Sequence, residues 1–169
     1  MTVAAEPFAQ RLIDVGLPAI RRSFVEFGDA ECILTTRILV GVARCLGHDA
    51  FALSVEGTFL PDPNPEKIVA MVGGRNADQY VSEDGSGDGW RGHLVAIVDR
   101  KTMVDGTAHQ VNKLSPLLHI VPFAVPLDPA EPFLHGRAEL AITTMDGTEI
   151  RYVARPGDRS YREHAGWTR

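Results

Sequence analysis

The run from Cys32 to Gly47 most constrains the fold, because its composition and both of its ends are typical of one long apolar helix. Asp29 is a candidate N-cap, and Gly47 is a candidate for the glycine that follows a helix C-terminus. The segments that follow are rich in β-branched and apolar residues, which is typical of strands. The sequence therefore predicts an α+β fold in which N-terminal helices pack on an antiparallel sheet.

The rest of the chain supplies shorter elements. Residues 6–27 have apolar positions at helical spacing, and Pro18 suits the first turn of a helix, so we expect two short helices joined near Gly16. The prolines at 122 and 126 predict an edge strand over 117–126. Residues 137–154 predict a hairpin with an Asp-Gly turn, and residues 157–167 predict a short helix.

A long excursion from Gly57 to Gly89 lies between two predicted strands. Its ends are rich in Pro, Gly, Asp and Ser, and only 67–72 within it is apolar enough for a short strand or helix. Loops of this length are often functional, and this one leads into Trp90 and His93. It is either a cover over a substrate site or a solvated insertion within one domain spanning 1–169.

The two cysteines have different expected environments. Cys32 lies where the helix begins, and the positive end of the helix dipole favours thiolate over thiol. A free cysteine is also one of the most frequently buried residues, so a core thiol is the structural alternative. Cys45 lies too far along the helix for a disulfide with Cys32, and we expect it to be a small buried apolar residue.

His93 and Asp105 lie on two segments that predict adjacent antiparallel strands around residues 99–101. A turn centred on Asp99 pairs His93 directly with Asp105, whereas a two-residue turn at 100–101 pairs His93 with Ala108. Each residue also has an ordinary structural explanation. His93 can bond to backbone at a strand end, and Asp105 followed by Gly is common turn chemistry.

A Cys, a His and an Asp that converge form a thiol nucleophile, its base and the residue that orients the base. No other site chemistry has comparable support. The chain has no Cys-x-x-Cys or His-x-x-x-His spacing, and its glycine-rich segments lack the Lys-Ser/Thr of a phosphate loop. We therefore expect neither a metal nor a cofactor.

The order of these residues resembles the transglutaminase-like branch of the papain-like cysteine protease superfamily. Val104-Asp105-Gly106-Thr107 is similar to the short Asp-x-Thr stretch of that family, and the helix over 32–47 with the strand after it is similar to its core. The resemblance covers roughly residues 28–110. It implies a papain-like core, and a Cys32, His93 and Asp105 triad that transfers acyl groups through a thioester.

The resemblance leaves the acyl acceptor open. Transfer to water makes a peptidase or deamidase, and transfer to an amine makes a transglutaminase-like or N-acetyltransferase-like enzyme. Glu26-Phe27-Gly28-Asp29 stands where arylamine N-acetyltransferases have Arg-Gly-Gly, which disfavours that option. The backbone N–H of Cys32 is a natural oxyanion donor, and Trp90 is a candidate second donor and substrate-binding residue. The alternative from another class is a non-catalytic binding module with the same fold.

Charge and hydropathy restrict the partners. A net charge of −5 lacks the basic excess of a general nucleic-acid binder. No apolar stretch is long enough to span a bilayer, and the first residues lack the pattern of a secretory signal, so a cytoplasmic location is the default expectation. The expected partner is an amide- or thioester-bearing peptide or small molecule, and the oligomeric state is left open.

Overall fold

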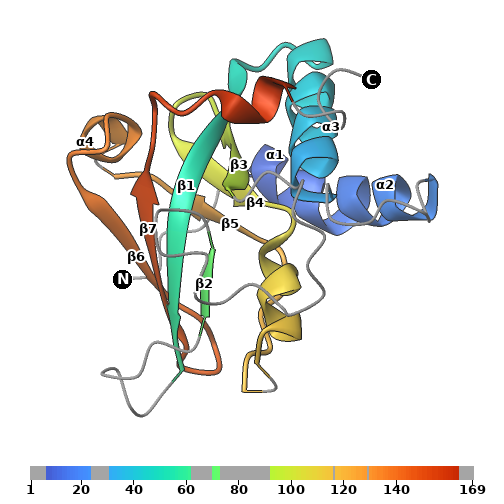
Figure 1. Cartoon of the computed structure of the whole chain (residues 1–169). Helices are drawn as coiled ribbons and strands as arrows, with labels where there is room; N and C mark the ends of the chain where they lie inside the picture. The colour runs from blue at the N-terminus through green and yellow to red at the C-terminus, as the bar shows by residue number, and fades with distance from the viewer. Residues whose placement is uncertain are drawn as a thin grey trace.

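A computed structural model describes residues 7–23, 31–61, 70–72, 92–115, 117–128 and 130–163. The fold is a mixture of helices and antiparallel sheet, as the sequence predicts at the level of class. Helices α1, α2 and α3 lie together on one side of the sheet (Figure 1). No helix in these ranges has the length and apolar character that a bilayer crossing needs.

The N-terminal helices follow the predicted pattern. Helix α1 (Pro7–Arg11) continues through a π-helical segment (Leu12–Gly16) into α2 (Leu17–Ser23), so the two helices are joined at Gly16 without a break in the helical path. Helix α3 spans Glu31–Cys45. Gly47 has φ +90°, and the N–H groups of Gly47 and His48 bond to the carbonyls of Arg44 and Ala43. This is a Schellman motif, which confirms the predicted end of α3.

The strands of the described residues form a seven-stranded sheet in the order β5-β4-β3-β1-β7-β6, with β2 paired to β1. Their bounds are β1 Ala50–Leu60, β2 Ala70–Val72, β3 His93–Val98, β4 Thr102–Asp105, β5 Phe123–Pro126, β6 Glu139–Thr143 and β7 Glu149–Ala154. Strand β5 is an edge strand, as its prolines predict, but it begins at Phe123, so the predicted strand over 117–122 is wrong. Strands β6 and β7 form the predicted hairpin.

The long strand β1 organises the sheet. Its residues 50–55 pair with β3, its residues 55–60 pair with β7, and Gly57–Phe59 pair with β2. The prediction that a loop begins at Gly57 is therefore wrong: Phe59 and Leu60 are buried, and their burial carries the strand past the glycine. The rest of the predicted excursion, apart from Pro61 and β2, lies outside the described residues.

The two faces of the sheet bury two different clusters. On one face, Ala96 and Val98 of β3 pack against Leu39 and Ala43 of α3. The other face is concave: Phe123 on edge strand β5 and Tyr152 on β7 have ring centroids 6.3 Å apart, although three strands separate β5 from β7 in the sheet. Side chains from distant strands can therefore meet inside this curl.

Three short helices complete the described chain: η3 (Ala108–Lys113), α4 (Ala130–Leu134) and η4 (Ser160–Glu163). The sequence predicts a helix over 157–167, and the structure has a single 3-10 segment there, with residues 164–169 outside the described ranges. The Asp158 carboxylate accepts a hydrogen bond from the Ser54 hydroxyl of β1 over 2.8 Å. This bond ties the C-terminal segment to the sheet.

Candidate catalytic site

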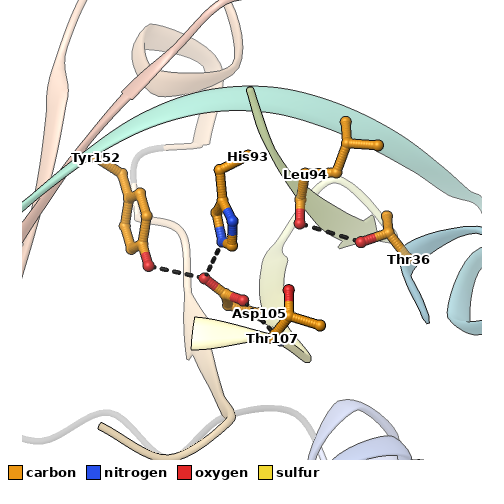
Figure 2. A network of polar contacts seen from close by, with 6 residues as sticks. All are labelled: Thr36, His93, Leu94, Asp105, Thr107 and Tyr152. Atoms are coloured by element: carbon orange, nitrogen blue, oxygen red, sulfur yellow. Dashed lines mark hydrogen bonds and ion pairs between the residues drawn. The ribbon is translucent and has the colours of Figure 1, made fainter. Parts of the chain in front are cut away.

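Cys32 is the second residue of α3, so its thiol lies in the first turn of the helix. The residue is 6% exposed and packs with Ile33, with Leu94 of β3 and with Tyr161 of η4. One turn along α3, the Thr36 hydroxyl donates a hydrogen bond to the Leu94 carbonyl over 3.0 Å (Figure 2). These contacts hold the start of α3 against the start of β3.

His93 is the first residue of β3, opposite Val55 of β1, and Asp105 is the last residue of β4. The pairing of Ala96 with Val104 and of Val98 with Thr102 centres the turn on Arg100. Both predicted registers are therefore wrong, because continuing this pairing places Thr107 opposite His93. Asp105 is two residues from that position, which keeps it on the same face as a diagonal neighbour of His93.

The diagonal arrangement brings the imidazole and the carboxylate into contact. His93 Nε2 and Asp105 Oδ2 are 2.7 Å apart, and both residues are buried. The Cys32 side chain contributes to raising the pKa of His93, so the thiol lies close to the imidazole. The structure thus joins His93 to Asp105 by a hydrogen bond and brings Cys32, at the helix start, near the same imidazole.

Asp105 has further hydrogen-bond donors that hold its carboxylate. The Tyr152 hydroxyl donates to Oδ2 over 2.7 Å, and the backbone N–H of Thr107 donates to Oδ1 over 3.0 Å (Figure 2). Asp105 therefore accepts three hydrogen bonds. A carboxylate bonded in this way is ionised and fixed in orientation.

The electrostatics of the group favour an ion pair. Burial by itself would lower the pKa of His93, but the charge of Asp105 and the bond to it, together with Cys32, raise that pKa from 6.5 to about 10. Burial would raise the pKa of Asp105, but the charge of His93 and the hydrogen bonds from His93, Tyr152 and Thr107 lower it instead. At neutral pH the pair is therefore imidazolium and carboxylate.

Sequence reasoning missed Tyr152 and Gly57. Tyr152 is fully buried on β7, its ring is nearly parallel to the His93 ring, and the centroids are 6.3 Å apart. A Cβ on Gly57 would lie 2.9 Å from Cε1 of Tyr152, so the tyrosine ring lies against the bare backbone of β1. A glycine between strand-like residues often marks such a close approach, and this was the available signal.

The turn after Asp105 packs against the helices. A Cβ on Gly106 would lie 3.0 Å from side-chain atoms of Leu17, Leu39 and Thr35, so this glycine lets the turn lie close to α2 and α3. The Thr107 hydroxyl is buried and has no hydrogen-bond partner among the described residues. The turn therefore holds Asp105 from the side of the sheet that α3 covers.

The predictions for Trp90 and Cys45 are the last two to compare with the structure. Trp90, the predicted substrate-binding residue, lies outside the described residues. The prediction that Cys45 is buried is wrong: the residue is exposed, because the buried face of α3 runs through Val40 and Ala43, and two further residues turn the helix by about 200°.

Chemically, the described residues offer a charged imidazole bonded to a carboxylate, with a thiol nearby. They contain no group of three His, Cys, Asp or Glu side chains that could hold a metal ion. No protein-family model matches the chain, and neither a curated protein nor a solved structure matches it.

Proposed function

We propose that this protein is a cysteine-dependent acyltransferase or amide hydrolase with the papain-like core of the transglutaminase-like branch. The observation that supports the proposal is the position of His93, whose Nε2 bonds to Asp105 and whose pKa is raised by Asp105 and by the nearby Cys32. Nucleophile, base and orienting residue are recognised by this order of contacts rather than by sequence position.

The proposed reaction has two steps. The Cys32 thiolate attacks the carbonyl carbon of an amide or thioester, and the backbone N–H of Cys32 at the helix start stabilises the oxyanion. The bond to the leaving amine or thiol breaks, and the His93 imidazolium gives that group its proton. In the second step neutral His93 takes a proton from water or an amine, which attacks the thioester and releases Cys32.

The raised pKa of His93 decides the state in which the imidazole begins the reaction. With a pKa of about 10, the imidazole is charged at neutral pH, and the Asp105 carboxylate stabilises that charge. His93 can therefore give a proton to the leaving group in the first step.

The burial of the thiol favours a second candidate, a non-catalytic binding module that keeps this fold. Cys32 is 6% exposed and His93 is 3% exposed, so a substrate carbonyl reaches the thiol only if the neighbouring groups move. In this second function Cys32 and Thr36 hold α3 against the sheet through their contacts with Leu94, and His93 and Asp105 do no chemistry. The two candidates differ in whether Cys32 accepts an acyl group.

Acylation by p-nitrophenyl acetate tests the proposal without a known substrate. We expect a burst of nitrophenolate, and intact-mass and peptide mass spectrometry should place one acetyl group on Cys32. Cys45→Ser removes the exposed thiol and should leave the burst intact, since Cys45 lies on the far face of α3. His93→Gln should slow acylation by about 10²- to 10⁴-fold, the usual contribution of a catalytic base.

Two results would contradict the proposal. One is acetylation confined to Cys45, which would show an ordinary exposed thiol reacting. The other is equal acylation of Cys32 in the protein with intact His93 and in His93→Gln, because the imidazole would then have no part in the chemistry. A Cys32 that stays unacetylated over pH 5–10 in folded protein would favour the binding module.

A further inference from the structure

We propose that Tyr152 is a positioning residue of this site: its hydroxyl holds the Asp105 carboxylate in the orientation that binds His93, and Gly57 provides the space for it. The inference deepens the proposed function and rests on it for its catalytic meaning. Its geometric content stands separately, because the Tyr152 hydroxyl bonds to Asp105 whatever Cys32 does.

The hydrogen bonds define what Tyr152 does. Asp105 Oδ2 receives both His93 Nε2 and the Tyr152 hydroxyl, each over 2.7 Å, while Oδ1 receives the N–H of Thr107. Two donors on one oxygen, with a third on the other, leave the carboxylate little freedom to rotate. Figure 2 shows His93 and Tyr152 approaching the same oxygen from neighbouring positions.

The position of the tyrosine ring depends on the missing side chain of Gly57. Tyr152 is opposite Gly57 in the pairing of β7 with β1, and a Cβ there would lie 2.9 Å from Tyr152 Cε1 and 2.9 Å from Val72 Cγ2. Strand β1 lies between β7 and β3, so a larger residue at 57 would push the ring out of line with Asp105. Gly57 thus acts on the site through Tyr152.

The hydrogen bond from Tyr152 changes the pKa of Asp105. Among the described residues, the titratable side chains that face Asp105 are His93 of β3 and Tyr152 of β7, with Cys32 of α3 beyond His93. The bond from Tyr152 favours the ionised carboxylate and so lowers the pKa of Asp105. Without it, Asp105 takes up a proton at a higher pH, and His93 loses its counter-charge there.

Tyr152→Phe tests the inference, since it keeps the ring and removes the hydroxyl. In the full chain with Cys45→Ser, NMR can follow the His93 ring N–H proton that bonds to Asp105 as the pH is lowered. We expect the NMR signal of that hydrogen-bonded proton to disappear at a higher pH in Tyr152→Phe than in the parent, because Asp105 is protonated at a higher pH there. The acid side of the acetylation profile of Cys32 should move in the same direction.

Thr36→Val is the matched control. It removes another buried hydroxyl, the one bonded to the Leu94 carbonyl, and lowers stability without touching Asp105. Thr36→Val should not change the pH at which the signal of the hydrogen-bonded His93 proton disappears. Gly57→Ala, which keeps the Tyr152 hydroxyl and displaces the ring, should act as Tyr152→Phe does.

The outcomes separate the two proposals. The positioning role is overturned if the His93 N–H signal disappears at the same pH in Tyr152→Phe as in the parent. It is also overturned if Thr36→Val shifts that pH as much as Tyr152→Phe does. If the His93 signal shifts as expected but Cys32 is not acetylated in the parent, Tyr152 positions Asp105 and the acyl-transfer function fails. If Cys32 is acetylated in the parent and the pH profile of Tyr152→Phe matches that of the parent, the acyl-transfer function stands and the positioning role of Tyr152 fails.

Discussion

Replacing Asp105 by Asn should lower the free energy of unfolding by about 3–5 kcal/mol, the usual cost of removing one partner from a buried ion pair. The structure gives a similar magnitude. Asp105 is fully buried and is the counter-charge of His93, whose pKa rises from 6.5 to about 10. At about 1.4 kcal/mol per unit, that rise corresponds to an upper limit of about 5 kcal/mol.

Urea denaturation at pH 7, followed by circular dichroism, measures this loss, and an unchanged denaturant slope would show that the unfolded state is unaffected. The melting temperature should fall by roughly 6–20 °C for a chain of this size. Asp99→Asn is the control, because Asp99 Oδ2 also lies 2.7 Å from a histidine, His48 Nδ1, but its side chain is 30% exposed. That variant should lose less than about 1 kcal/mol.

The direction of the pKa shifts at the site determines how its contribution to stability changes with pH. The pKa of folded His93 is raised, so its contribution to stability is fully present below pH 6.5 and is lost as the pH rises through about 10. Between these values the advantage over Asp105→Asn should shrink by about 1.4 kcal/mol per pH unit. The pKa of Asp105 is lowered, so its contribution is present above 3.8 and is lost as the pH falls through the lowered value.

Two results would refute this reasoning. Equal losses in Asp105→Asn and Asp99→Asn would mean that burial does not strengthen the pair at the site. A constant difference between the parent and Asp105→Asn from pH 6.5 to 10 would mean that His93 is not held in its charged form. In either case the ion-pair description of the site would have to be abandoned.

Three further substitutions test other parts of the structure by urea denaturation. Cys45→Ser should change stability by less than about 0.5 kcal/mol because the residue is exposed, and a larger loss would put it back in the core. Thr107→Val should stabilise by about 1 kcal/mol, since it removes a buried hydroxyl without a partner among the described residues, and a loss would show that the hydroxyl is bonded. Gly47→Ala should destabilise by about 1 kcal/mol because its φ is +90°, whereas Gly157→Ala, where a Cβ meets open space, should cost less.

Much of the fold follows from local sequence. The stop at Gly47, the Asp-Gly turn before β7 and the edge position of β5 each depend on one residue type with a restricted backbone, and each is found where the sequence places it. Phe59 and Leu60 illustrate the limit. Their burial in the curled sheet continues β1 beyond Gly57, and that burial is a property of the assembled sheet.

The register of His93 and Asp105 shows a different limit. Asp99 and Arg100 have φ of 49° and 55°, a left-handed conformation that is unusual for arginine. The Asp99 carboxylate accepts hydrogen bonds from the Asp49 N–H and pairs with His48, so contacts with the end of α3 hold this turn. The sequence correctly placed the two catalytic candidates on adjacent strands but had no means of detecting these contacts.

Tyr152 could not be linked to the site from the sequence alone. It lies 47 residues after Asp105 and three strands away in the sheet, and only the curl of the sheet brings its hydroxyl to the carboxylate. A buried tyrosine on an alternating strand is ordinary core sequence. What distinguishes it is the neighbouring Gly57, whose role becomes visible only when β7 is paired with β1.

The arrangement of these residues favours acyl transfer over a purely structural role. A buried ion pair adds little stability compared with well-packed apolar side chains, so the fold alone gives no reason for His93 and Asp105 to be charged inside it. Gly57 also weakens β1, since glycine loses the most conformational freedom on folding. Yet the absence of its side chain lets Tyr152 reach Asp105, which in turn fixes the imidazole beside Cys32. Residues that cost stability and improve the geometry of one site are expected where that site performs chemistry.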